Sequence, residues 1–258
     1  MEHDEQGLNN KVIKWLRETG FPLEMEAAAA FRNAGFEVRQ SGTFRDPESN
    51  KGREIDVLAS DPDIIGVIDI SFVIECKATQ KPWIVLTAQD ALGNFNRMTA
   101  FSVLSRDARK ALASRFPGLP PELRKYIKRS NKGGYGLRQA LGNGDDVAYA
   151  AAMSALKGCH DLASKTSTHF PTLTFAFPII VVDAPLFECS RQDDGEITIE
   201  RVEISEFLFS AHIPDRLDAC IRVVSREKLV EFAREMKKLA DVLRREFKKE
   251  EDDAFKRL

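Results

Sequence analysis

Residues 70–79 read ISFVIECKAT, an apolar and largely β-branched run that predicts a buried strand. This run also carries a carboxylate at Glu75 and an ammonium at Lys77. Side chains at positions i and i+2 point to the same face of a strand. Charged side chains are seldom buried unless they are paired or bind a metal. The stretch therefore indicates a polar site built into an otherwise apolar strand.

A second acidic residue lies in the strand predicted before this one. Residues 53–60, REIDVLAS, place Asp56 inside another β-branched run, although aspartate is disfavoured in strands. Residues 36–44, FEVRQSGTF, predict a strand that pairs with it as a hairpin across a long polar connection. The sequence thus predicts three successive strands, two of which carry acids.

A helix is predicted directly before the hairpin. Residues 22–35, PLEMEAAAAFRNAG, begin with a proline that suits the first helical turn and end with a glycine that suits the C-cap. The apolar face of this helix is flanked by Glu24 on one side and Glu26 on the other. Helical geometry alone does not decide which of the two faces the strand acids. A shorter amphipathic helix is predicted before it, over 9–20.

The Glu-x-Lys pattern by itself is weak, because it occurs three times in the chain, beginning at Glu75, Glu235 and Glu246. The last two lie in a predicted C-terminal helix, where residues two apart diverge by about 200° and cannot converge on one ligand. Only the pattern at Glu75 lies in a predicted strand, so we select that one as the candidate site.

The order of a helix, a strand, a strand with Asp56 and a strand with Glu75-Cys76-Lys77 resembles the PD-(D/E)xK nuclease superfamily, which has the restriction-endonuclease-like fold. The resemblance covers residues 20–90, and the segments GREID and ECKATQKPW are similar to bacterial restriction-endonuclease-like proteins. Asp56 follows isoleucine, where many members have proline. The resemblance implies an α/β domain over 1–258 with a central mixed β-sheet flanked by helices.

The same resemblance implies roles for these residues. Asp56 and Glu75 would hold one or two Mg²⁺ (or Mn²⁺) ions, with the main-chain carbonyl of Cys76 as a further ligand, since Mg²⁺ prefers oxygen ligands. Lys77 would orient or deprotonate the attacking water, or offset charge on the phosphate. Glu24 is favoured over Glu26 as the supporting helix residue by the resemblance alone.

The rest of the chain predicts further α/β elements. WIVLTA at 83–88 continues the third strand or forms a fourth. A helix is expected from Gln89 toward Ser105, and another over 145–159 with Asp145 or Asp146 at its N-terminus. Other predicted elements are strands at 174–189, 196–204 and 219–225, and a C-terminal helix at about 225–250.

One segment is strongly basic. Between Arg106 and Arg138 there are ten Lys or Arg and two acids, a charge of +8, so the remainder of this −2 chain carries −10. We interpret residues 106–143 as an insertion of turns and short helices rich in Pro and Gly. Its charge suits a nucleic-acid partner, while a solvated loop is the plainer alternative. The candidate nucleic-acid-binding residues are Lys125, Lys128, Arg129 and Lys132.

We therefore expect a Mg²⁺-dependent nuclease that hydrolyses phosphodiester bonds, foremost in DNA, in restriction, defence or repair. A fold relative that binds nucleic acid or a partner protein without cutting is the alternative, and a plain α/β domain with a strand salt bridge is a third. A homodimer or a partner subunit is compatible with the resemblance. Scattered cysteines, no signal sequence and an apolar stretch interrupted by prolines suggest a cytoplasmic chain with reduced thiols and no membrane span.

Overall fold

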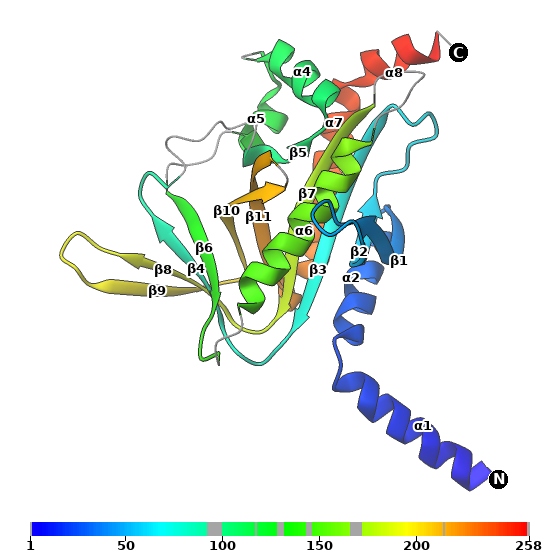
Figure 1. Ribbon diagram of the computed structural model, residues 1–258, viewed down its shortest axis with the longest axis vertical. Coiled ribbons are helices and arrows are strands. Elements are labelled where there is room, and N and C mark those ends of the chain that lie inside the picture. The colour runs from blue at the N-terminus through cyan, green and yellow to red at the C-terminus, as the bar shows by residue number, and fades with distance from the viewer. Residues whose placement is uncertain are drawn as a thin grey trace.

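The computed structural model describes residues 2–91, 100–116, 118–127, 132–142, 146–165, 172–213 and 215–256. It is a mixed α/β structure in which helices flank both faces of an eleven-stranded sheet (Figure 1). The strands are β1 (Glu37–Arg45), β2 (Gly52–Ser60), β3 (Ile68–Ala78), β4 (Trp83–Ala88), β5 (Val103–Leu104), β6 (Gly133–Gln139), β7 (Leu173–Asp183), β8 (Leu186–Arg191), β9 (Ile197–Val202), β10 (Ile204–Ile213) and β11 (Asp215–Ser225). The described helices are α1 (Glu2–Arg17), α2 (Phe21–Asn33), α4 (Arg106–Arg115), α5 (Pro121–Ile127), α6 (Val147–Ser164), the short η1 (Arg226–Lys228), α7 (Leu229–Glu246) and α8 (Lys248–Phe255).

The first half of the sheet contains the three strands with the candidate residues. β1, β2 and β3 form an antiparallel meander. β7 then pairs with β3 in parallel along its whole length, and β11 pairs in parallel with β7. A parallel pair needs a crossover connection, and α6 precedes β7 on one face of the sheet. The predicted mixed sheet flanked by helices is confirmed.

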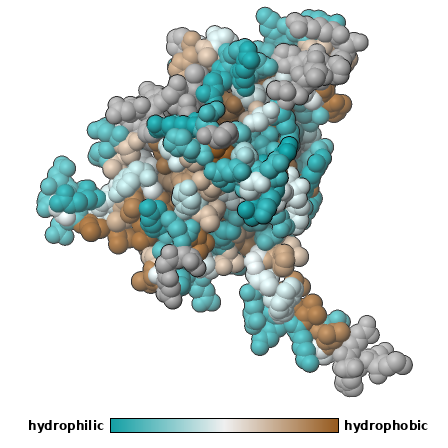
Figure 2. Space-filling model, viewed as in Figure 1, coloured by the Kyte–Doolittle hydropathy of each residue, from teal (hydrophilic) through white to brown (hydrophobic). Residues whose placement is uncertain are grey.

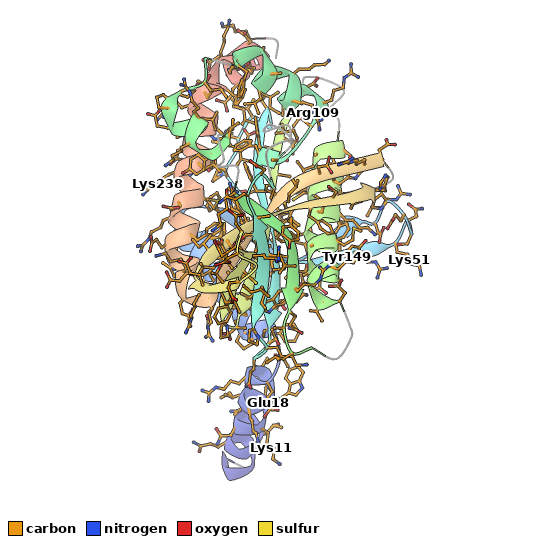
Figure 3. All side chains as sticks on the ribbon, turned by 90° about the vertical axis from the view of Figure 1, so that its left-hand side faces the viewer. Lys11, Glu18, Lys51, Arg109, Tyr149 and Lys238 are labelled. Carbon is orange, nitrogen blue, oxygen red and sulfur yellow. The ribbon has the colours of Figure 1, made fainter. Side chains whose placement is uncertain are left out.

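Two helical layers enclose this half of the sheet. Figure 3 shows α7, with Lys238, and α6, with Tyr149, on opposite sides of it. On the α2 and α7 side, the ring centroids of Phe72 and Phe177 lie 5.1 Å apart. On the other side, α6 packs so closely that a Cβ on Gly158 would lie 2.9 Å from the Val73 side chain. Glycine at this position therefore lets α6 approach the strand that carries Glu75.

The second half of the sheet joins the first through β10 and β6. Their parallel pairing consists of Phe207 opposite Gly134. A Cβ on Gly134 would lie 2.3 Å from the carbonyl oxygen of Glu206, so only glycine fits at this junction. β6 continues to β4, β8 and β9, which form the far edge of the sheet. The WIVLTA segment is therefore a separate fourth strand.

The prediction of a helix from Gln89 toward Ser105 is confirmed at residues 100–101, which are helical, and is wrong at its two ends. Residues 89–91 form a turn. Val103–Leu104 form β5 beside β7, and Ser105 instead caps α4 by accepting a hydrogen bond from the Ala108 amide. Residues 92–99, in the middle of this prediction, lie outside the described residues. Burial of two apolar side chains against β7 has overridden the helical pattern.

The basic insertion contains the short helices α4 and α5, as predicted, but it is not composed only of turns and helices. β6 lies inside it and pairs with both β4 and β10. Farther on, β10 was missed, because 196–204 splits into β9 and the start of β10. The predicted strand 174–189 likewise divides into β7 and β8. The predicted C-terminal helix begins with η1 and is interrupted at Phe247, between α7 and α8.

The first helix projects away from the sheet (Figure 1). Four of its apolar side chains are exposed: Leu8, Val12, Ile13 and Trp15. Figure 2 shows hydrophobic and hydrophilic residues side by side on the projecting part of the molecule. The helix predicted from the amphipathic pattern is present as α1, but these apolar side chains do not pack into the core. Within the described ranges, no helix combines the length and the apolarity needed to cross a membrane.

Candidate active site

The pairing of β2 is interrupted at Asp56. On the β1 side, Gln40 pairs with Val57 and Gly42 pairs with Ile55, so the described register skips Asp56. On the β3 side, the described register ends at Val57 opposite Ile74. Asp56 thus lies where β2 separates from β3, at a gap in the ladder between the two strands.

The Asp56 side chain fills this gap. Its Oδ2 atom accepts a hydrogen bond from the Cys76 amide at 2.7 Å. Burial raises the pKa of Asp56 above its ordinary value, while the Cys76 amide and the Lys77 charge act against this rise. The N–H and C=O of a strand residue point to the same side in a ladder. The Cys76 carbonyl is therefore directed toward the side of Asp56, the direction expected for a metal ligand beside that carboxylate.

Glu75 and Lys77 form an ion pair beside this gap. The Lys77 Nζ donates to Glu75 Oε1 at 2.6 Å, and the Glu75 side chain is only 11% exposed. Burial and the neighbouring Asp56 charge raise the pKa of Glu75, while Lys77 and the Ser154 side chain lower it. Burial would lower the pKa of Lys77, but Glu75 and Asp56 outweigh it, so the net shift is upward. The ammonium therefore remains charged within the cluster.

Of the two helix acids, only Glu24 belongs to this cluster. Burial raises the pKa of Glu24, followed by the charges of Asp56, Glu54 and Glu75, while Lys77 lowers it. Glu26 instead receives two hydrogen bonds from Arg226, which also contacts Asp183. The geometry thus separates the two residues, which the helical pattern did not.

The cluster has the ligand chemistry of a divalent-cation site but is not preassembled. Glu24, Asp56 and Glu75 supply carboxylate oxygens, and the charge of Asp56 raises the pKa values of both Glu24 and Glu75. Within the described parts of the chain, no three acidic, His or Cys side chains are grouped closely enough to bind a metal as they stand. The Cys76 amide bonds to one carboxylate oxygen of Asp56, and the Lys77 ammonium bonds to one carboxylate oxygen of Glu75. Each carboxylate has a second oxygen that can bind a metal. The donor set fits Mg²⁺, provided that these side chains rearrange around it.

The candidate nucleic-acid-binding residues are only partly described. Lys125, at the end of α5, is exposed, with its ammonium 4.6 Å from the centre of the Tyr126 ring. Lys132 lies just before β6 and lines a cavity between α7 and the sheet. Lys128 and Arg129 lie outside the described residues.

Trp83 and Asp46 have structural roles. Trp83 is fully buried in the core. Asp46 Oδ1 accepts the Glu48 amide at 3.0 Å, as in an Asx turn. It also accepts a hydrogen bond from Lys157 of α6, so the turn is fixed to that helix. Sequence reasoning missed Ser154, which contacts Glu75 from α6, because a serine within an alanine-rich helix gives no signal of its own.

No protein-family model, curated protein or solved structure matches this chain. The function is therefore inferred from the geometry of these side chains and from the motif that they form.

Proposed function

We propose that this protein is a Mg²⁺-dependent nuclease with a restriction-endonuclease-like core, acting foremost on DNA in the cytoplasm. One observation supports the proposal: Asp56 and the Glu75–Lys77 pair lie together where β2 separates from β3, and Glu24 of α2 interacts electrostatically with all three. The order of α2, β1, β2 and β3 agrees with the order of the motif. A plain α/β domain with a structural salt bridge would require only Glu75 and Lys77, and would leave Asp56 and Glu24 without a role.

The proposed chemistry assigns one task to each side chain. Asp56, Glu75 and the Cys76 carbonyl would hold the metal, which when bound supplies positive charge to the phosphoryl oxygens and makes water more acidic. Lys77, held by Glu75, would orient the attacking water or offset charge on the phosphate. Glu24 would hold a metal-bound or attacking water from the helix side.

One observation favours the alternative of a fold relative that binds without cutting. Asp56 already accepts a hydrogen bond from the Cys76 amide, and Glu75 accepts one from the Lys77 ammonium. The described residues contain no preassembled set of metal ligands. The two functions are separated by incubating the protein with plasmid and with single-stranded DNA, in Mg²⁺ and in EDTA. A nuclease cleaves in Mg²⁺ and stops in EDTA, whereas a binding protein retards the DNA and leaves it intact in both.

Glu24→Gln is expected to lower cleavage by about tenfold to a hundredfold, the range for residues that orient a metal site. Glu26→Gln is the matched control. It removes the same charge two residues farther along α2 and disturbs the exposed ion pair with Arg226. It should cleave at the parent rate. The measurement is the cleavage rate at saturating Mg²⁺. A larger loss in Glu26→Gln than in Glu24→Gln would reverse the assignment of the helix residue.

Neutralising the four candidate residues of the basic segment together should weaken DNA binding without affecting the metal site. Each lost phosphate contact should flatten the slope of log K against log salt by up to about 0.9 on duplex DNA. Binding to all sequences should fall alike, and cleavage should recover at low salt. The substituted residues are Lys125, Lys128, Arg129 and Lys132.

The matched control removes four exposed positive charges from the opposite end of the protein, at Lys11, Lys14, Arg17 and Arg39. The change in net charge is the same, so only the position of the charges differs. Equal salt slopes for the two quadruple variants would show that the basic segment is a solvated surface and makes no specific contact with DNA.

A further inference from the structure

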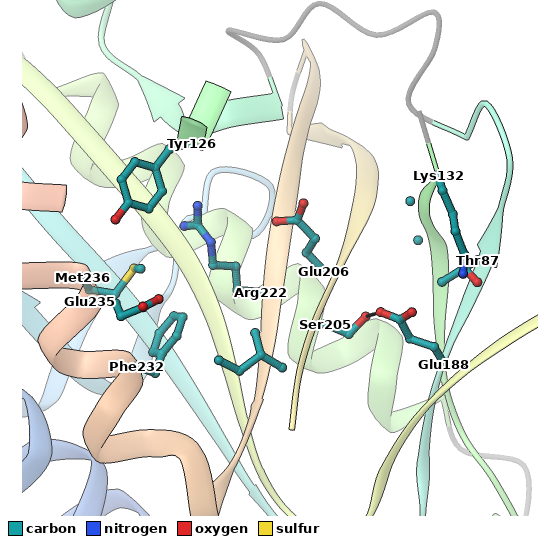
Figure 4. A pocket seen from close by; sticks show the side chains of 13 residues that line it. Thr87, Tyr126, Lys132, Glu188, Ser205, Glu206, Arg222, Phe232, Glu235 and Met236 are labelled. Carbon is teal, nitrogen blue, oxygen red and sulfur yellow. Dashed lines mark hydrogen bonds between the residues drawn. The ribbon is translucent and has the colours of Figure 1, made fainter. Parts of the chain in front are cut away.

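A cavity of about 410 Å³ lies at the junction of the two halves of the sheet, on the face covered by α5 and α7 (Figure 4). It lies beside the pairing of β10 with β6 at Gly134, which is one of its lining residues. Its size is within the range of cavities that bind small molecules. Its lining residues come mainly from α5, α7 and five strands, and include Thr87, Tyr126, Glu188, Ser205, Arg222 and Phe232.

Arg222 is the unusual member of this lining. It is only 8% exposed, and its guanidinium lies 5.7 Å from the centre of the Phe177 ring. Among the described residues, no carboxylate lies within ion-pair distance of it. Figure 4 shows its side chain in the cavity between Tyr126, Glu206 and Glu235. Burial lowers the pKa of Arg222 from its ordinary value. A buried cation with no ion-pair partner among the described residues is costly, so this arginine is placed for an anion that binds there.

The other walls restrict what that anion can be. Tyr126 and Phe232 lie on the same side of the cavity as Arg222 and offer aromatic surface (Figure 4). The lining has two positive residues, Lys132 and Arg222, against three glutamates, so its formal charge is −1. A polyanion would be repelled, whereas a ligand with one anionic group and several hydrogen-bond donors would match. Glu188 already accepts the Ser205 hydroxyl at 2.7 Å, which fixes one of these acceptors in place.

We propose that this cavity binds a nucleoside monophosphate, with its phosphate on Arg222, its base against Tyr126 and Phe232, and its hydroxyl or amino groups on the glutamates. A guanidinium matches phosphate in geometry and in charge. The site is distinct from the proposed nuclease centre. Arg222 pairs with Ile179, which pairs with Ile74, so Arg222 lies on the opposite face of the sheet from Glu75. The proposal therefore does not depend on the nuclease assignment.

The test is calorimetric titration of the full chain at constant ionic strength. The probes are AMP, GMP, CMP and UMP, the four corresponding nucleosides, and inorganic phosphate. At least one monophosphate should bind saturably, and its nucleoside and inorganic phosphate should each bind at least about tenfold more weakly, since each lacks one group of contacts. Absence of saturable binding by all four monophosphates would overturn the proposal. Inorganic phosphate binding as tightly as the best monophosphate would also overturn it.

Variants then test the position of the phosphate. Arg222→Met should weaken monophosphate binding by about tenfold to a hundredfold, the loss expected for a charge-assisted contact. Arg222→Lys should lose less, because it retains the charge but not the planar fork. Arg39→Met, at an exposed arginine on β1, is the matched control and should bind like the parent. Unchanged affinity in Arg222→Met would contradict the proposal. If that variant does not fold, the affinity of Arg222→Lys and the probe series on the parent still test whether the phosphate binds at Arg222.

Discussion

Asp56→Asn, Glu75→Gln and Lys77→Ala are each expected to lower the rate of Mg²⁺-dependent DNA cleavage by about a hundredfold or more. Each change removes a charge that the proposed mechanism uses at the phosphate. The fold should be retained, because each substitute is no larger than the residue that it replaces, and two of the three keep its shape. The measurement is the single-turnover cleavage rate, with circular dichroism as the check on folding.

Metal binding separates the roles within this set. The two acid substitutions should weaken Mn²⁺ binding in calorimetry, whereas Lys77→Ala should largely spare it, since an ammonium is no metal ligand. Glu37→Gln, at an exposed glutamate of β1, is the matched control and should cleave and bind metal like the parent. If Lys77→Ala lost metal binding as fully as Glu75→Gln, the division of roles would be wrong.

The second large effect is expected on stability, at Asp61. This carboxylate lies just beyond β2, is 2% exposed, and is held between Lys237 and Arg244 of α7, with Arg244 Nε at 2.7 Å. Asp61→Asn should lower the free energy of unfolding by about 2–4 kcal/mol, because it removes a buried charge and leaves two cations facing a neutral group. The measurement is urea denaturation, analysed at constant m-value.

Asp241→Asn is the matched control for this prediction. Asp241 pairs with the same Lys237 at 3.0 Å, but its side chain is 58% exposed. An exposed pair of this kind contributes about 0.5 kcal/mol or less. Equal losses in the two variants would mean that burial at Asp61 does not set the strength of the contact between α7 and the β2–β3 connection.

The first part of the fold could be predicted from sequence because its signals are local. The helix α2, the hairpin of β1 and β2, and the strand β3 are each specified by caps, turns and runs of β-branched residues. Asp56 and Glu75 were found because they violate the apolar pattern of buried strands.

The remainder depends on contacts between distant segments. β6 was missed because GGYGLRQ has no strand signal, and it becomes a strand only where Gly134 allows it to approach β10. The choice between Glu24 and Glu26 required the position of Arg226, which is 200 residues away from Glu26 in the chain. Arg222 could not be singled out, because its burial and the lack of a nearby carboxylate among the described residues arise only in the packed structure.

The most direct test of the proposed nuclease is the cleavage of plasmid DNA by the parent and by Glu75→Gln, side by side in Mg²⁺. We predict that the parent converts supercoiled plasmid to nicked or linear forms, that EDTA abolishes this, and that Glu75→Gln cleaves at least about a hundredfold more slowly. Near-normal cleavage by Glu75→Gln would contradict the assignment of the site. Intact plasmid with the parent protein at all Mg²⁺ concentrations would contradict the proposed cleavage of duplex DNA itself.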